Sequence, residues 1–465
     1  MTTTINITGG TYKRKSLQLS AAVTRNFWPQ VENPKAKSPY VLESFPGKTL
    51  FGAVTGSNNR GMKEHLGVVY KITDNILYTV DSAGTYTSRG TIPGVSRCII
   101  EGIGISVVIV TDGVPYVWNG TTLTTVTDGD LESPNACAHL NNQIIYDGDN
   151  GRFATSDVGD ATSVDALNYA TAESNADDLV RPYSFDQLVY MMGDKTVEPW
   201  WNSGVGKPPF DRLEGSIVQV GLGALHSVAN TRTATYFLGN DNLIYAMKGS
   251  QAEPVFNDAM AAEISKFTFI SDAIGFCYNI DGQWFYEITF PTEDRTFCHP
   301  EGGETVELSS GDSGGRNIAD SYCYAFRKHL VAGAHDGSIY ELSFDNYTEN
   351  GNAIIRLRDT APLHGGLFGA SGKTLTMNRF ELILECGVGT LSGQGIDPVV
   401  MLSFSDDGHS FSTEMWQTVG RIGQYQWKVE WFMLGSFTSR VIRIRVSDPV
   451  HWSIHSSAAD IEIGI

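Results

Sequence analysis

The sequence predicts an all-β protein with a β-propeller-like domain of six or seven irregular blades, a C-terminal antiparallel β-sandwich and an N-terminal extended arm. Asp-Gly and Asn-Gly pairs separate short runs of β-branched residues, which is the strongest local signal for hairpins. The chain has 49 glycines and only 18% charged residues, a balance typical of many turns and few solvated helices. Strand–turn–strand units recur roughly every 40 to 48 residues, the length of a four-stranded blade.

The first element in chain order is the arm, predicted at residues 1–50. It has no clear periodicity, and a loop rich in proline and lysine follows Arg25-Asn26-Phe27-Trp28-Pro29. Because Phe27 and Trp28 are large and apolar, we expect the arm to dock on a surface.

The propeller-like domain is predicted at residues 51–350. Val107–Val110 leads through Asp112-Gly113 to Pro115–Trp118, and His329–Gly333 leads through His335–Ser338 to Ile339–Leu342. Both residues of such a tight turn must accept positive φ, which Asp, Asn and Gly tolerate best. No WD or kelch signature marks the units, so we interpret the repeat as one of pattern.

One short helix interrupts this strand pattern. Asn257 or Asp258 can cap a helix over residues 259–267, in which Met260, Ile264 and Phe267 share one face.

The third domain is predicted at residues 351–465, where the blade spacing ends. Strands are expected at Arg379–Glu385, Val399–Ser405, Lys428–Phe432 and Val441–Ser447, with Asp406-Asp407-Gly408 forming a turn. This pattern favours a separate antiparallel sandwich.

Charge is unevenly distributed along the chain. Residues 1–50 carry seven Lys/Arg and two Asp/Glu, residues 51–350 carry 17 and 39, and residues 351–465 carry nine and 11, so the balances of +5, −22 and −2 give the total of −19. A body this acidic repels a DNA backbone, which excludes a conventional nucleic-acid reader. The acidity serves either simple solubility or a surface along which DNA slides without sticking.

Other global features narrow the class of protein. No run approaches 18 apolar residues and the N-terminus lacks an apolar signal segment, so we expect neither a membrane span nor a signal peptide. The six cysteines are scattered without a C-x-x-C pair, which indicates isolated reduced thiols in the cytosol where the chain is made.

One segment matches a catalytic motif. Gly311-Asp312-Ser313-Gly314-Gly315 is the nucleophile pattern of trypsin-like proteases, which also need a histidine base and an aspartate. The nearest candidate base, His139, lies in a different sequence context, and the flanks of Ser313 are typical of a flexible loop. We therefore expect no catalytic residue, while a protease that uses Ser313 remains a hypothesis.

Metal and calcium sites are not expected either. His451 and His455 point to one face of a strand but are too far apart to chelate an ion without a third ligand. Cys298-His299 has no supporting ligand, and neither Asp406-Asp407-Gly408 nor Asp128-Gly129-Asp130 continues into a calcium loop. We predict no metal, no cofactor-binding residue and no cofactor.

Aromatic residues leave a second function class open. Trp200-Trp201 or Trp284 could form a platform for a sugar, although aromatics buried at a blade edge are the more usual arrangement. A carbohydrate-binding or carbohydrate-active tail propeller is therefore the alternative function.

Several segments together resemble a known family, the packaged-DNA stabilisation or tail hub (nozzle) proteins of short-tailed phages. The segments, in chain order, are Ser44-Phe45-Pro46-Gly47 followed by Arg60-Gly61, Ser250–Pro254 leading into the helix, Asp281–Pro291, Phe404–Gly408, Gly420–Gly423, Trp431 and Ser447–Val450. None is a catalytic fingerprint, and their order and spacing carry the resemblance over most of the chain.

The resemblance implies a non-enzymatic structural protein of the virion tail. It implies a homohexameric ring below the portal-adaptor protein, which extends the DNA channel, helps to retain packaged DNA and provides attachment surfaces for a tail needle or plug and for tailspikes or fibres. Double-stranded DNA would pass without specific binding, and the basic arm could reach an acidic neighbour in the ring.

Overall fold

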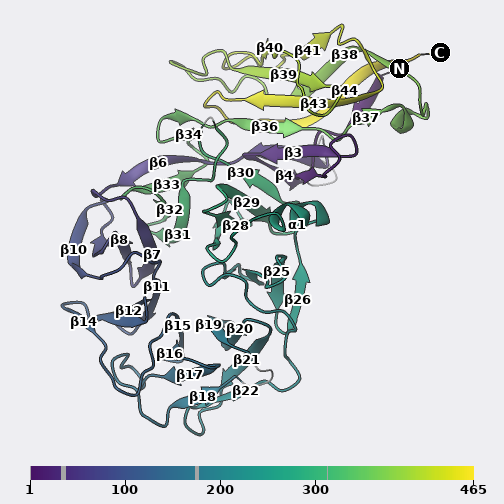
Figure 1. Cartoon of the computed structure of the whole chain (residues 1–465). Helices are drawn as coiled ribbons and strands as arrows, with labels where there is room; N and C mark the ends of the chain where they lie inside the picture. Colours follow the sequence, from purple (N-terminus) through teal and green to yellow (C-terminus); the bar gives the residue numbers. More distant parts are fainter. Residues whose placement is uncertain (1, 33–37, 173–176, 312, 465) are drawn as a thin grey trace.

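The computed structural model describes residues 2–32, 38–172, 177–311 and 313–464. In Figure 1 a ring of small sheets lies below a sandwich, and both ends of the chain lie in the sandwich. The fold is all-β, as predicted, with one α-helix and one 3-10 helix among the described residues.

The ring is a propeller of seven four-stranded blades in the described residues. Five blades are separate sheets, and two more are parts of an eleven-stranded and a six-stranded sheet. The count therefore falls within the predicted six or seven. The first blade contains β7 (Asn59–His65), β8 (Val68–Thr73), β9 (Ile76–Val80) and β10 (Tyr86–Thr91). The second contains β11 (Ile99–Ile103), β12 (Ser106–Thr111), β13 (Val114–Trp118) and β14 (Leu123–Thr125). The third contains β15 (Cys137–Leu140), β16 (Gln143–Asp147), β17 (Arg152–Thr155) and β18 (Tyr169–Thr171).

The other four blades complete the ring. The fourth blade contains β19 (Leu179–Phe185), β20 (Leu188–Gly193), β21 (Val197–Asn202) and β22 (Phe210–Arg212), and the fifth contains β23 (Ala229–Asn230), β24 (Thr235–Leu238), β25 (Ile244–Lys248) and β26 (Gln251–Pro254). The sixth contains β27 (Ile274–Ile280), β28 (Gln283–Phe290), β29 (Arg295–Pro300) and β30 (Val306–Leu308). The seventh contains β31 (Ala319–Ala325), β32 (Lys328–Gly333), β33 (Ile339–Ser343) and β6 (Gly47–Gly52).

The predicted turn chemistry builds the hairpins. Asp112 and Gly113 have φ values of 51° and 75°, and they connect β12 to β13 with Thr111 opposite Val114. Asp281 and Gly282 do the same between β27 and β28, with φ values of 50° and 84°. Alternating apolar residues then pack between neighbouring blades, so the propeller has several small cores.

The predicted helix is α1 (Asp258–Ile264), between the fifth and sixth blades. Asn257 is its N-cap, because the Asn257 side chain accepts a hydrogen bond from the Met260 backbone N–H at 2.9 Å. Met260 and Ile264 are buried, and Phe267 packs against the same core just beyond the helix end.

The sandwich consists of two sheets around one large core. Its predicted strand at 399–405 is found without change, and the other three differ by a few residues at their ends. The strands are β1 (Thr2–Ile5), β2 (Tyr12–Lys13), β3 (Ala21–Arg25), β4 (Phe27–Val31), β5 (Tyr40–Ser44), β36 (Arg356–Asp359), β37 (Leu363–His364), β38 (Leu375–Leu384), β39 (Val399–Ser405), β40 (Met415–Thr418), β41 (Val429–Phe432), β42 (Ser436–Phe437), β43 (Ser439–Val446) and β44 (Ser453–Ile463). The 3-10 helix η1 (Gly365–Phe368) and the hairpin β34 (Thr348–Glu349) and β35 (Asn352–Ala353) complete the elements.

The described part of the first fifty residues, expected as an arm, docks within the chain itself. β1 pairs with β44, β4 and β5 join the same sheet, and β6 closes the last blade by pairing with β33. Phe27 is fully buried in the sandwich core, and Trp28 packs edge-on against Phe285 of the sixth blade at 5.2 Å. The segment is therefore a strap that belongs to both β units.

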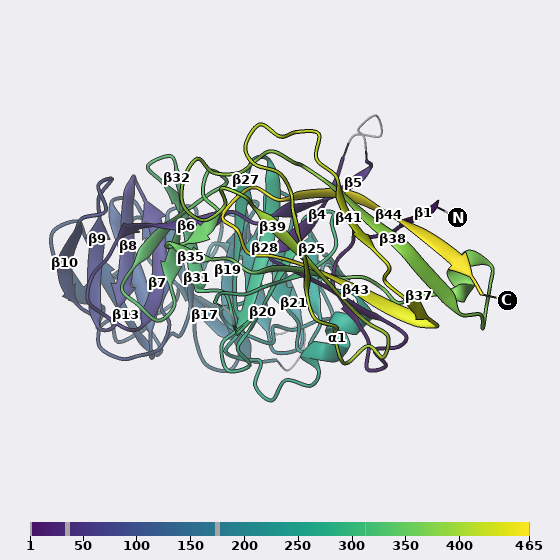
Figure 2. The same cartoon turned by 90° about the horizontal axis from the view of Figure 1, so that it is seen from above.

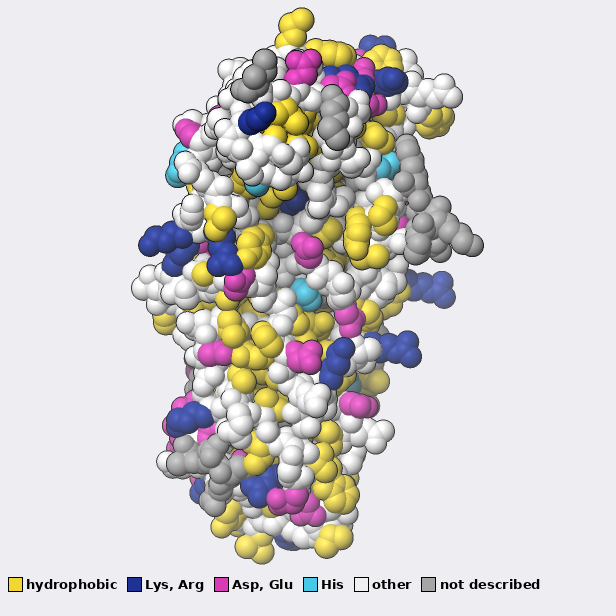
Figure 3. Space-filling model, turned by 90° about the vertical axis from the view of Figure 1, so that its right-hand side faces the viewer, with side chains coloured by type: hydrophobic (Ala, Val, Ile, Leu, Met, Phe, Trp, Pro, Cys, Tyr) yellow, Lys and Arg dark blue, Asp and Glu magenta, His cyan; other side chains and the backbone are white. Residues whose placement is uncertain are grey.

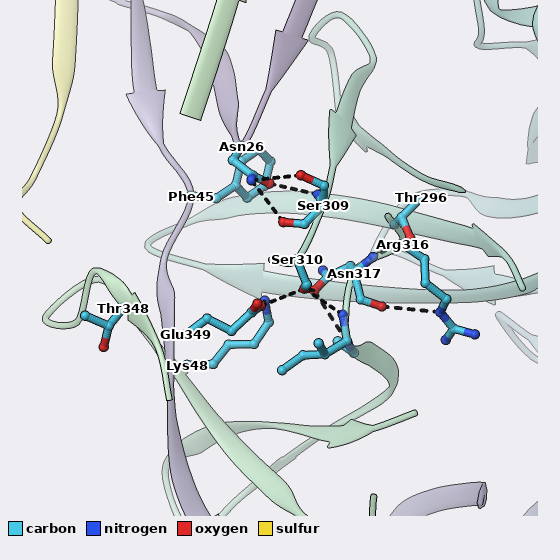
Figure 4. A network of polar contacts seen from close by, with 12 residues as sticks. Asn26, Phe45, Lys48, Thr296, Ser309, Ser310, Arg316, Asn317, Thr348 and Glu349 are labelled. Atoms are coloured by element: carbon cyan, nitrogen blue, oxygen red, sulfur yellow. Dashed lines mark hydrogen bonds and ion pairs between the residues drawn. The ribbon is translucent and has the colours of Figure 1, made fainter. Parts of the chain in front are cut away.

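Two features connect the sandwich to the propeller. β3 pairs with β30 in parallel, so one eleven-stranded sheet runs from the sixth blade into the sandwich (Figure 1). Seen from above in Figure 2, the first blade lies at one end of the molecule, and β37 and β44 of the sandwich lie at the other. A buried polar network lies beside this joint (Figure 4): Lys48 forms an ion pair with Glu349 at 2.8 Å, and the Ser310 hydroxyl donates to Glu349 at 2.8 Å. β6, the 309–318 connection and β34 are thereby fixed to one another.

Basic side chains of the strap pair with the acidic middle of the same chain. Arg14 contacts Asp258 at 2.5 Å, Arg25 contacts Glu307 at 3.0 Å, and Lys48 contacts Glu349. Some of the basic residues near the start of the chain therefore form ion pairs with acidic residues of the same molecule.

Candidate functional site

The structure does not assemble a protease site around Ser313. Ser313 is exposed in the connection between β30 and β31, whereas His139 lies on β15 and lines the central cavity of the propeller. No hydrogen bond joins the two side chains, and Asp312 lies outside the described residues. The described residues of the motif belong to a turn that the β-bridge between Ser310 and Gly315 closes.

The histidines singled out in the sequence have protein partners. The His451 ring contacts Glu385 at 2.8 Å through Nδ1 and Glu43 at 2.9 Å through Nε2. His299 is buried, its Nδ1 lies 3.1 Å from the Thr305 hydroxyl, and burial lowers its pKa to about 4. Within the described ranges, no group of three His, Cys, Asp or Glu side chains could hold a metal ion.

The two aspartate pairs stabilise turns. Asp406 makes a two-pronged ion pair with Arg440 at 2.6 and 2.8 Å, and Asp407 accepts backbone N–H bonds from His409 and Ser410, both at 2.7 Å. These backbone bonds hold the pKa of Asp407 below its usual range. Asp128 likewise accepts from the Asp130 and Val164 backbone N–H groups, both at 3.0 Å.

The tryptophans do not form a common platform. Trp200 is buried and packs edge-on against Phe153 at 5.1 Å, while its neighbour on β21, Trp201, is 43% exposed. Adjacent strand residues point to opposite faces, so the two rings cannot bind one sugar together. Trp284 lies on β28, two blades away.

A central cavity of about 380 Å³ lies where the seven innermost strands converge. Its lining includes side chains from β7, β11, β15, β19, β27 and β31 and from the segment that ends in β23. Ion pairs cross it between blades: Lys63 contacts Glu101 at 2.5 Å, and Arg97 contacts Asp320 at 3.0 Å. These pairs join the first blade to the second and the second to the seventh.

A second cavity of about 460 Å³ lies between propeller and sandwich. Its lining combines the β27–β28 turn, including Asp281 and Gln283, with Trp28, Tyr347 and His451. The hydrogen bond that the His451 ring donates to Glu43, the charge of Glu43, and the hydrogen bond and charge of Glu385 raise the pKa of His451 above the ordinary histidine value.

A ring of aspartates lies on one face of the propeller, which we call the acidic face. Every turn between the second and third strands of a blade contains an aspartate, and such turns lie at one end of the strands in an up-and-down blade. All seven are at least partly exposed: Asp74, Asp112, Asp149, Asp194, Asp241, Asp294 and Asp336. Connections between blades add Asp130, Glu132 and Glu214 to the same end of the strands.

These aspartates carry a sequence repeat that the strand pattern alone missed. In five of the seven turns a Tyr or Phe follows the Asp by four residues, and two of these tyrosines bond back to it: Tyr245 donates to Asp241 at 2.5 Å and Tyr340 donates to Asp336 at 2.7 Å. Aligning the predicted turns on their aspartates would have revealed the repeat.

The sandwich exposes aromatic side chains along its open edge. β40 ends one sheet and β41 ends the other, and the two meet where the Trp431 ring N–H donates to the Met415 carbonyl at 3.0 Å. Their neighbours Trp416 and Phe432 are 64% and 59% exposed. On the side of the molecule in Figure 3, acidic, basic and hydrophobic side chains are interspersed.

No helix of the described part of the chain has the length and apolar character that crossing a membrane requires.

Comparison with known proteins gives a match to two family models. One, described as bacteriophage P22 Gp10, beta-propeller, matches residues 3–347, and the other, described as bacteriophage P22 Gp10, beta-sandwich, matches residues 362–462. No curated protein matches the chain.

Among solved structures, similar folds include a streptogramin B lyase (10% identity, 64% of this chain, 97% of that chain, TM-score 0.44). Others are BamB from Moraxella catarrhalis (11%, 74% and 98%, TM-score 0.41) and the computationally designed protein Ika8 (12%, 63% and 99%, TM-score 0.42). With TM-scores below 0.5, these likenesses carry no functional information.

Proposed function

The chain belongs to the bacteriophage P22 Gp10 family, and from this membership we propose that it forms the hub or nozzle of a short phage tail. Membership makes it a structural component of the tail, and the observation that carries the proposal is the match to both β units in the family's order. As proposed, six copies form a ring below the portal-adaptor protein, extend the DNA channel and help to retain the packaged genome.

The strap supports a mechanical role. A subunit of a DNA channel must transmit force between its neighbours without opening. Here β1, β3, β4, β5 and β6 join both β units through main-chain pairing, and the Lys48–Glu349 ion pair is buried at their joint. Propeller and sandwich therefore move together.

The acidic face supports passage of DNA without binding. Phosphates repel carboxylates over about 10 Å at ordinary salt, so a wall that presents this face to the lumen offers the DNA no site to pause. We propose that the acidic face is turned toward the DNA.

The exposed edge of the sandwich supports contacts with other proteins. Trp416 and Phe432 lie beside unpaired strand edges, and interfaces are enriched in aromatic residues. We propose that such surfaces contact neighbouring copies, the adaptor, the needle or plug, and tailspikes or fibres.

Location in the virion is the direct test of the hub. Electron microscopy of particles that carry a labelled copy of the chain should place the label in a ring between the adaptor and the tip of the tail. A label on the capsid shell ends the proposal.

Charge reversal tests the orientation of the acidic face. The variant with Asp130→Lys, Asp149→Lys and Glu214→Lys changes three exposed residues on this face and should slow genome release from tailed particles, measured with a DNA-binding dye. The control with Asp81→Lys, Asp186→Lys and Asp345→Lys makes the same charge change at exposed positions in turns at the opposite end of the strands. Equal release by both variants, with equal numbers of tailed particles, contradicts the orientation.

A further inference from the structure

We propose that the central cavity of the propeller binds a small oxyanion, of the class of inorganic phosphate, at the guanidinium of Arg181. The site lies on the axis of the blades, apart from the acidic face and the sandwich edge, and it does not depend on the proposed tail function.

The first support is an unbalanced buried charge. Arg181 lies on β19, is 9% exposed and lines the cavity. Its Nη1 donates to the Leu225 carbonyl at 2.9 Å, but its Nε is buried without a partner, and no carboxylate forms an ion pair with it among the described residues. The other two cations of the lining, Lys63 and Arg97, each have a carboxylate. A buried cation without a counter-charge is costly, and a bound anion would remove that cost.

The second support is a set of neutral donors in the same lining. His139 lies on β15, next to β19 in the ring, and its Nε2 is buried without a partner. Ser184 of β19 also lines the cavity, and its hydroxyl is buried and unpaired. Burial lowers the pKa of His139 and of His226, so both rings are neutral near pH 7 and can still donate one N–H.

The third support is the place of the site in the ring. The site lies at the seam between β19 of the fourth blade and the segment that ends in β23 of the fifth. Arg181 bridges this seam through the Leu225 carbonyl, and Tyr183 bridges it through Asn230 at 2.6 Å. An oxyanion at Arg181 would add a further bridge between these two blades. A water molecule takes about 30 Å³ in the liquid, so a cavity of about 380 Å³ has room for an oxyanion and its water.

Calorimetric titration of the purified chain with inorganic phosphate tests the proposal. At constant ionic strength in chloride we expect saturable heat and an unfolding temperature that rises with phosphate concentration. Arg181→Gln should weaken binding at least tenfold, and Arg181→Lys, which keeps the charge, should weaken it less. The matched control is Arg232→Gln, because Arg232 is exposed in the β23–β24 turn, and it should bind like the unaltered chain.

His139→Leu keeps the test decisive if Arg181→Gln does not fold. It removes one donor, leaves Arg181 in place and should weaken phosphate binding severalfold. Absence of saturable heat with the unaltered chain overturns the proposal, and so does equal binding by folded Arg181→Gln.

Discussion

The propeller and the sandwich bury their strands in different ways. Each propeller blade takes its strands consecutively from the chain, except for β6, and buries them against the next blade in small separate cores. The sandwich instead collects strands from both ends of the chain around one core, with Thr2 opposite Asp460. The comparison shows that both units depend on strands of the strap to complete their sheets.

Two buried arginines show the same difference between local and long-range contacts. Arg60 in the propeller donates to the carbonyls of Asp74, Ile92, Pro93 and Ser96, all within forty residues of it. Arg358 in the sandwich donates to the carbonyls of Ile7, Gly9 and Gly10 at 2.7 to 3.1 Å and to the Thr24 hydroxyl at 2.6 Å. One guanidinium organises local loops, and the other fastens the start of the chain to its last quarter.

The largest expected effect is on the strap. Arg358→Ala leaves several buried carbonyls unpaired and should lower the free energy of unfolding by about 3–5 kcal/mol, measured by urea denaturation. Protease should then cut residues 1–20 before the propeller. Arg14→Ala, which removes an exposed ion pair, should leave the free energy of unfolding nearly unchanged. Equal costs would show that the strap is not held through Arg358.

Arg60→Ala should disturb the other region. We expect a cost of about 3 kcal/mol, because Arg60 is fully buried and its acceptors lose their donor. Hydrogen exchange should accelerate in β7–β12 and remain slow in β38 and β44. Faster exchange in the sandwich would contradict the separation of the two regions.

Asn26 lies at the joint between propeller and sandwich, and substitutions of Asn26 test how this joint is stabilised. Its amide donates to the Ser309 carbonyl at 3.0 Å and the Ile355 carbonyl at 2.8 Å, and its φ is 56° (Figure 4). Asn26→Gly should cost about 2 kcal/mol through the lost bonds, and Asn26→Ala about 1 kcal/mol more because alanine disfavours a left-handed backbone. If thermal unfolding shows the two variants to be equally stable, backbone conformation is not part of the joint.

A buried acid in the propeller predicts a pH dependence. Burial raises the pKa of Glu287 to about 7, so folding favours its protonated form. The penalty is absent below the ordinary pKa of about 4.5 and complete above pH 7, so stability should fall by about 3 kcal/mol as pH rises through this range. Glu287→Gln keeps the oxygen that accepts from Asn317 at 2.7 Å and should flatten this part of the profile. An unchanged profile assigns the dependence to another group.

The smallest expected effect concerns His451 at the second cavity. A histidine whose folded pKa is raised contributes stability that is fully present below about pH 6.5 and is lost as pH rises through the folded value. The side chain is 34% exposed, so screening keeps the contribution below about 1 kcal/mol. His451→Gln should remove the slope that begins above about pH 6.5, and a slope that persists would exclude His451 as its source.

Much of the propeller could be predicted because its information is local. The hairpins at Asp112-Gly113 and Asp281-Gly282 need only two turn residues of the right backbone freedom and β-branched neighbours. The helix after Asn257 needs only its cap and three apolar positions. The expectation that Ser313 belongs to a loop also rested on nearby residues.

The amino-acid sequence by itself therefore determined the hairpin turns of the propeller, many of its strands and the all-β class. Only the tertiary structure decided which strands meet across hundreds of residues, such as β3 and β30 at Arg25 and Glu307. It also decided which buried cations have no carboxylate beside them among the described residues, such as Arg181. The physical reason is that a turn selects its conformation from adjacent residues, whereas long-range pairing and the balance of buried charge depend on the whole packed chain.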